Sequence, residues 1–116
     1  MNCFSSFEDF CTEIKQCGIP VAEAEYAKGK SAPNITFFRG EEQTIYANSE
    51  PVFKLSRIVV ELYTEKTDNT SEEKFEEWLE SVEITYQKNS RTWISSEKWY
   101  QTIYEFWVIF DGSCND

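Results

Sequence analysis

The fold is decided by the stretch Val60-Glu61-Leu62-Tyr63-Thr64-Glu65-Lys66-Thr67-Asp68, which runs directly into Asn69-Thr70-Ser71-Glu72-Glu73-Lys74-Phe75-Glu76-Glu77-Trp78-Leu79. Its first part continues an alternating pattern that predicts a strand over residues 52–64. Ile58, Val60 and Leu62 share one face of this strand. The other face carries Arg57, Val59, Glu61 and Tyr63. One face of the strand is therefore expected to be buried, while the other is mixed.

The second part of the stretch predicts an amphipathic helix. A turn at residues 67–69 leads into Thr70-x-x-Glu73, a spacing typical of a capping box. Helical spacing then gives an apolar stripe of Phe75, Trp78, Leu79 and Val82. The other faces carry glutamates at positions 72, 73, 76, 77, 80 and 83, which we expect to lie in solvent.

A first helix is predicted over residues 5–17. Ser5-x-x-Glu8 has the capping-box spacing, and Gly18 with Pro20 ends the helix. The residues at helical spacing are Phe7, Phe10, Cys11, Ile14 and Cys17. Together with the helix that follows Thr70, this helix gives the chain two apolar stripes that can pack on a sheet.

The remaining segments favour strands. Shorter ones are predicted over residues 21–26, 35–39, 44–47, 84–87 and 92–94, with a loop at 28–33 and a break at Gly40–Gln43. A long strand is predicted over 99–110, in which Tyr100, Thr102, Tyr104, Phe106, Val108 and Phe110 share one face. Residues 1–116 are thus expected to form one α+β domain, with a mainly antiparallel β-sheet and two amphipathic helices packed on one face.

The opposite face of the two long strands is too apolar to lie in water. Ile103, Trp107 and Ile109 lie on it in the last strand, and Tyr63 lies on it in the strand before the second helix. Either a neighbouring subunit or a loop around residues 39–51 would cover this face. Aromatic residues are enriched at interfaces, so Tyr63, Ile103 and Trp107 are the candidate subunit-interface residues.

Composition excludes several classes of function. Twenty-one acidic residues against 11 basic ones give a net charge of −10, which opposes nucleic-acid binding. No apolar stretch is long enough to span a membrane, and the first residues lack the features of a signal peptide. There is no histidine to act as a general base or a metal ligand. We therefore expect no enzyme activity, cofactor or metal, and synthesis in a cytoplasm.

The four cysteines Cys3, Cys11, Cys17 and Cys114 contain no Cys-x-x-Cys pair. Cytoplasmic proteins keep their thiols reduced, so all four are expected to be free thiols.

Several motifs of the chain together resemble those of tail-terminator (tail-completion) proteins of long-tailed bacteriophages and prophages. They are Pro20-Val21 after the first helix, Glu61-Leu62-Tyr63-Thr64-Glu65-Lys66, and the paired glutamates of 72–77. A fourth motif is Glu97-Lys98-Trp99-Tyr100, which continues to Tyr104-Glu105-Phe106-Trp107-Val108. The resemblance covers nearly the whole chain, most specifically residues 58–108. Trp99 beside Tyr100 and the cysteine-rich first helix depart from the family pattern.

The resemblance implies a structural protein of the virion, located at the head-proximal end of the tail. Such a protein forms a hexameric ring that ends polymerisation of the tail tube. Its partners are its own copies, the major tail tube protein and the head-completion or connector protein, and DNA passes through the ring without specific binding. An acidic ring would repel DNA, which suits this role. Two alternatives remain open: a small acidic intracellular binding or inhibitor module, and another neck or tail-tube component of similar fold.

Overall fold

The computed structural model describes residues 3–24, 31–112 and 114. The helices are α1 (Phe7–Ile14), a short 3₁₀ helix (Lys15–Cys17) and α2 (Ser71–Ser81). The strands are β1 (Cys3–Phe4), β2 (Val21–Glu23), β3 (Asn34–Ala47), β4 (Glu50–Thr64), β5 (Gln87–Lys88), β6 (Thr92–Ile94) and β7 (Trp99–Phe110). The predicted strand over 21–26 is shorter, and residues 25–26, like residues 28–30 of the loop expected at 28–33, lie outside the described residues.

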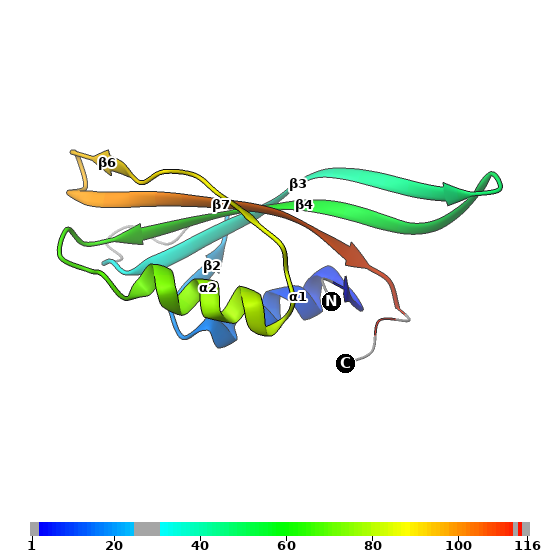
Figure 1. Ribbon diagram of the computed structural model, residues 1–116, viewed down its shortest axis with the longest axis horizontal. Coiled ribbons are helices and arrows are strands. Elements are labelled where there is room, and N and C mark those ends of the chain that lie inside the picture. Colours follow the sequence, from blue (N-terminus) through cyan, green and yellow to red (C-terminus); the bar gives the residue numbers. More distant parts are fainter. Residues whose placement is uncertain (1–2, 25–30, 113, 115–116) are drawn as a thin grey trace.

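The sheet is built around three long antiparallel strands, β3, β4 and β7 (Figure 1). Strand β2 adds to the outer edge of β3, and β1, β5 and β6 add to the outer edge of β7. The β1–β7 and β2–β3 pairings are parallel. The expectation of one small, mainly β domain with two helices is confirmed, but the sheet is mixed rather than purely antiparallel because its edge strands run parallel to their neighbours.

The hydrophobic core lies between the sheet and the two helices, which are on the same side of the sheet in Figure 1. Alternate residues of β7 point into it, and Thr102, Tyr104, Phe106 and Val108 are all buried. Phe10 and Ile14 of α1 and Phe75 and Leu79 of α2 are fully buried against them. Most members of the sheet faces and helix stripes predicted from periodicity are buried. Five of them are only partly buried: Phe7, Cys11, Val82, Tyr100 and Phe110.

The helices begin differently from the predicted capping boxes. In α1 the cap is Ser6 rather than Ser5, because the Ser6 side chain accepts the hydrogen bond from the Asp9 amide. The N-cap of α2 is Thr70, whose side chain makes no capping bond. Instead, Asp68 Oδ1 accepts hydrogen bonds from the amides of Thr70 and Ser71, each at 3.0 Å. The positive N-terminal end of the helix dipole also stabilises the Asp68 carboxylate at this position.

The break expected at Gly40–Gln43 is wrong. Strand β3 continues through it, and the ladder with β4 shows only an irregularity between Arg39 and Glu42. A β-bulge of this kind bends a strand without ending it. The two strands run on to a tight turn at Asn48 and Ser49, which both have positive φ angles. They form a two-stranded arm, residues 43–53, that projects beyond the end of β7 (Figure 1).

The expectation that all the glutamates of α2 lie in solvent is wrong for Glu72 and Glu76. Both carboxylates bind Lys88 Nζ, at 2.8 and 2.7 Å. Glu76 Oε2 also accepts a hydrogen bond of 2.8 Å from the hydroxyl of buried Tyr104. Burial alone would raise the pKa of Glu76, but these hydrogen bonds hold its pKa below the ordinary value. The acidic face of α2 is therefore partly a polar contact with the strands.

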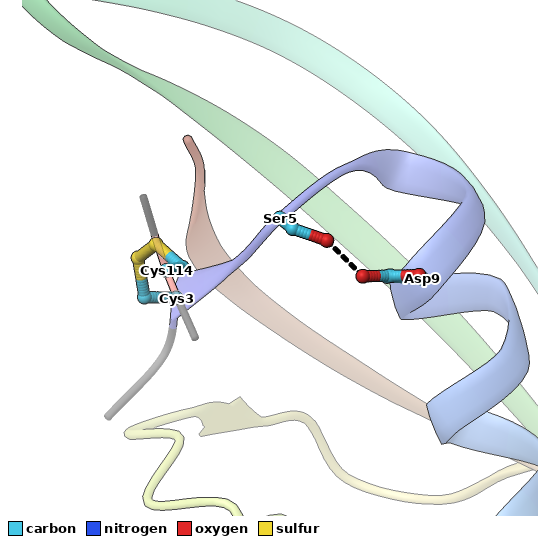
Figure 2. The surroundings of a disulfide bond; sticks show 4 residues. All are labelled: Cys3, Ser5, Asp9 and Cys114. Carbon is cyan, nitrogen blue, oxygen red and sulfur yellow. Dashed lines mark hydrogen bonds between the residues drawn. A yellow bond between two sulfur atoms is a disulfide. The ribbon is translucent and has the colours of Figure 1, made fainter. Parts of the chain in front are cut away.

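The prediction of four free thiols is wrong for two of them. Cys3 and Cys114 form a disulfide bond that joins β1 to the segment after β7 (Figure 2). Their Cα atoms are 5.7 Å apart, within the range that a disulfide spans. Cys11 and Cys17 are free, as predicted. Near the bond, the hydroxyl of Ser5 donates to the Asp9 carboxylate, which helps to fix the entry into α1.

We expect Cys3→Ser to lower the free energy of unfolding of the oxidised protein by about 2–5 kcal/mol, because the bond closes a loop of nearly the whole chain. Urea titration measures this cost. Cys11→Ser, which keeps the bond, is the control and should cost less. Thiol titration of the denatured, unreduced protein should detect only Cys11 and Cys17. Four reactive thiols in that titration would contradict the pairing.

We expect Glu76→Gln to cost about 1–3 kcal/mol in urea unfolding, since it weakens charged hydrogen bonds to Lys88 and Tyr104. The exposed neighbour Glu77 provides the control, and Glu77→Gln should change stability by at most about 0.5 kcal/mol.

The lowered pKa of Glu76 makes its contribution pH-dependent. A carboxylate with a depressed folded-state pKa stabilises the fold above its unfolded pKa, and that stability is lost as pH falls through the folded value. The difference between wild type and Glu76→Gln should therefore shrink below about pH 4. A difference that is constant from neutral to acidic pH would show that the charge of Glu76 contributes nothing.

Candidate subunit interface on the open sheet face

The candidate site is the face of the sheet that points away from α1 and α2, called the open face here. In an antiparallel sheet, directly paired residues point to the same side. Tyr63 pairs with Gln101, Glu61 with Ile103, and Arg57 with Trp107, all on the open face. The three residues predicted as interface residues, Tyr63, Ile103 and Trp107, therefore lie on one surface. All three are partly exposed.

One end of the open face is a hydrogen-bonded cluster around Glu61. Its Oε1 atom accepts from Thr36 Oγ1 and from the Tyr63 hydroxyl, each at 3.1 Å. Gln101 Nε2 donates to the same hydroxyl at 3.0 Å, and the Tyr63 ring lies against Trp99. These contacts hold the Tyr63 side chain in one orientation, so it offers a partner a rigid aromatic surface.

The middle of the open face mixes apolar and charged side chains. Phe38 is 40% exposed, and Val59 beside it pairs with Glu105 of β7. Arg57 binds the Glu105 carboxylate through Nε, at 3.1 Å, and through Nη2. This bond from Arg57 lowers the pKa of Glu105 below its ordinary value. The ion pair is about 30% exposed on each side chain, so this part of the face is a partly solvated surface and not a hydrophobic core.

The structure removes one of the two expected covers for this face. Residues 39–51 are not a loop that folds over it, because they belong to β3, the turn and β4. The strands carry them along the plane of the sheet and away from the domain (Figure 1). A loop cover at 39–51 is therefore excluded.

The chemistry of the open face is that of hydrogen-bonding and charged groups. Burial raises the pKa of Tyr63, so its hydroxyl stays protonated and acts as a hydrogen-bonding group. Among residues 3–24, 31–112 and 114, no group of three or more acidic or cysteine side chains is arranged to hold a metal ion. Within the same residues, no helix is long and apolar enough to cross a membrane.

Sequence reasoning missed several residues of this surface. The alternation of 57–63 already places Arg57 and Glu61 on the open face, but their partners Glu105 and Thr36 come from other strands and depend on register. The pattern of residues 35–39 predicts a short strand that contains Phe38, but it does not give the register of that strand with β4. Cross-strand pairing, which the sequence does not show, was the missing information.

We expect the two faces of β7 to differ sharply in their contribution to stability. Phe106→Ala removes a ring that is only 3% exposed and should cost about 3–5 kcal/mol. Trp107→Ala, one residue away on the open face, should lower the free energy of unfolding by about 1 kcal/mol in dilute protein, where no second subunit is bound to this face. Urea unfolding of both variants measures this, and equal costs would show that the open face is covered within one chain.

Two comparisons with known proteins identify no family for this chain. A scan against models of protein families found no match, and a search of curated proteins found none.

Proposed function

We propose that this protein is a tail terminator: a non-enzymatic virion protein that forms a hexameric ring at the head-proximal end of a phage tail tube. The ring ends tube polymerisation and joins the tail to the head connector. In this proposal the open face, with Tyr63, Ile103 and Trp107, is covered by the next subunit.

The observation that carries the proposal is an ordered but uncovered sheet face in a chain whose motifs resemble this family. The polar groups of the open face are paired within the chain, through Glu61–Thr36 and Arg57–Glu105, so docking a neighbour leaves few unsatisfied groups. Its aromatic groups give a neighbour apolar area to bury. A rigid surface also loses little conformational entropy on assembly.

The net charge of −10 supports the same role. Six copies would carry a large negative charge around a channel, and like charges keep a DNA backbone from adhering to the wall. No tight binding site for nucleic acid is expected, and the ring would let DNA pass.

The proposal is tested by adding the purified protein to growing tail tubes of a long-tailed phage and imaging them by negative stain. Tubes of limited length that end in a ring are the expected result. Trp107→Ser should reduce the fraction of ring-capped ends by about tenfold or more, because it removes apolar area from the subunit contact. Glu77→Gln, on the outer side of α2, is the control.

Circular dichroism melting of Trp107→Ser must first show a folded protein, so that a lost ring is not mistaken for a lost fold. Tubes that keep growing with wild-type protein present would reject the terminator function. Capping that is equally efficient in Trp107→Ser would reject the open face as the subunit contact.

A further inference from the structure

The arm, residues 43–53, has a strand edge to which no described strand is paired. Within the described residues, β2 covers the outer edge of β3 only at 35–37, and no strand pairs with the outer edge of Gln43–Ala47. This strand segment, Gln43-Thr44-Ile45-Tyr46-Ala47, carries no charge and no proline. Charged residues and proline normally protect a free strand edge from pairing with another strand. The neighbouring strand of the arm has its own protection, since Pro51 and an irregularity beside it lie there.

The arm also exposes apolar side chains. Tyr46 is 63% exposed and Val52 is 52% exposed, and both belong to the part of the hairpin beyond β7. An isolated two-stranded hairpin is only marginally stable in water. A third strand at the Gln43–Ala47 edge would bury part of Tyr46 and satisfy the free backbone groups.

A matching edge lies at the opposite end of the 51 Å long molecule (Figure 1). Strand β6, Thr92-Trp93-Ile94, pairs with β7 on one side, and no described strand pairs with its outer side. It is also uncharged and carries the exposed Trp93, at 42%. The Trp93 ring lies edge-on against Tyr100 with 4.9 Å between centroids, so its position is fixed before any partner binds.

The charges at the two ends are not what selects the partner. The arm and its base carry Glu41, Glu42 and Glu50 against Lys54, which lies 4.0 Å from Glu42. At the β6 end, Lys88 is already bound by Glu72 and Glu76, and Arg91 by Glu72, so these basic groups are largely neutralised within the chain. A second copy of the same chain therefore supplies the strand edge and the aromatic group that the arm lacks, and no excess charge opposes the contact at β6.

We propose that the arm of one copy adds as an edge strand to β6 of the next, in a head-to-tail contact between Gln43–Ala47 and Thr92–Ile94. Because the two surfaces differ, the contact is heterologous and generates a ring if the rotation closes, or a filament if it does not. Tyr46 of one copy lies close to Trp93 of its neighbour, and the two uncharged strand segments pair through their backbone groups. The contact extends the sheet from copy to copy and does not require the terminator function.

Two variants that each disable one end test this contact. Tyr46→Lys disables the arm and Trp93→Lys disables the β6 end; both positions are exposed, so folding should be preserved. Gln16→Lys, on the exposed surface of the 3₁₀ helix, makes the same change of charge elsewhere and is the control. Circular dichroism melting confirms the fold of each, and sedimentation velocity at about 0.15 M salt measures assembly.

Wild type and Gln16→Lys should form multimers with rising concentration. Each end variant alone should require an at least about tenfold higher protein concentration than wild type to reach the same degree of assembly. An equimolar mixture of Tyr46→Lys and Trp93→Lys keeps one intact arm and one intact β6 end between them, so it should form dimers that grow no further. This complementation is the signature of a head-to-tail contact.

The other outcomes overturn the proposal. Trp93→Lys that assembles like wild type would show arm-to-arm pairing, and assembly of both variants would show that neither end is used. A mixture that stays monomeric, or a wild-type chain that is monomeric at every concentration, would exclude the contact. All these measurements use the free protein, so a failure to cap tail tubes would reject the terminator function and leave this contact standing.

Discussion

The pairing of β4 with β7, from Lys54–Phe110 to Thr64–Tyr100, is the constraint on which the other features depend. Side chains alternate along a strand, so a slip of one residue would exchange the two faces. Buried Tyr104 opposes such a slip, because its hydroxyl reaches Glu76 of α2 only in the observed register. In the same register Ile103 and Trp107 point to the open face. The interior hydrogen bond and the candidate interface are thus consequences of one alignment.

The two candidate contacts differ in their physical character. The open face is broad and its charges are already neutralised in pairs, such as Arg57 with Glu105, so its contribution is mainly apolar area and shape. The ends of the molecule instead offer free backbone groups beside the exposed side chains of Tyr46 and Trp93. Because hydrogen bonds between strands are directional, pairing of these edges sets the relative orientation of two copies.

The sequence was a good guide wherever the signal is local. The stripe of Phe75, Trp78 and Leu79 and the alternation in 58–64 and 99–110 predicted buried faces correctly, and alternation placed Tyr63, Ile103 and Trp107 on one surface. The sequence predicts poorly wherever contacts between residues far apart in the chain determine the structure. Gly40 is typical of a strand end, but pairing with β4 carries the strand across it. The pattern of α2 predicts solvated side chains for Glu72 and Glu76, but the fold brings Lys88 and Tyr104 to them. Cellular compartment predicts free thiols but contains no information on which sulfur atoms lie close together.

The bond between Cys3 and Cys114 has a topological consequence. With a sequence separation of 111 residues, it turns almost the whole polypeptide into one covalent loop. A single protease cut at an exposed turn, such as Asn48–Ser49, would then leave both fragments tied together and still paired across β3 and β4. Tension applied at the two cysteines would be carried by the sulfur bridge and not by the strands. A subunit that must hold a particle together while its contents are under pressure, or survive outside a cell, gains durability from such closure without any additional core.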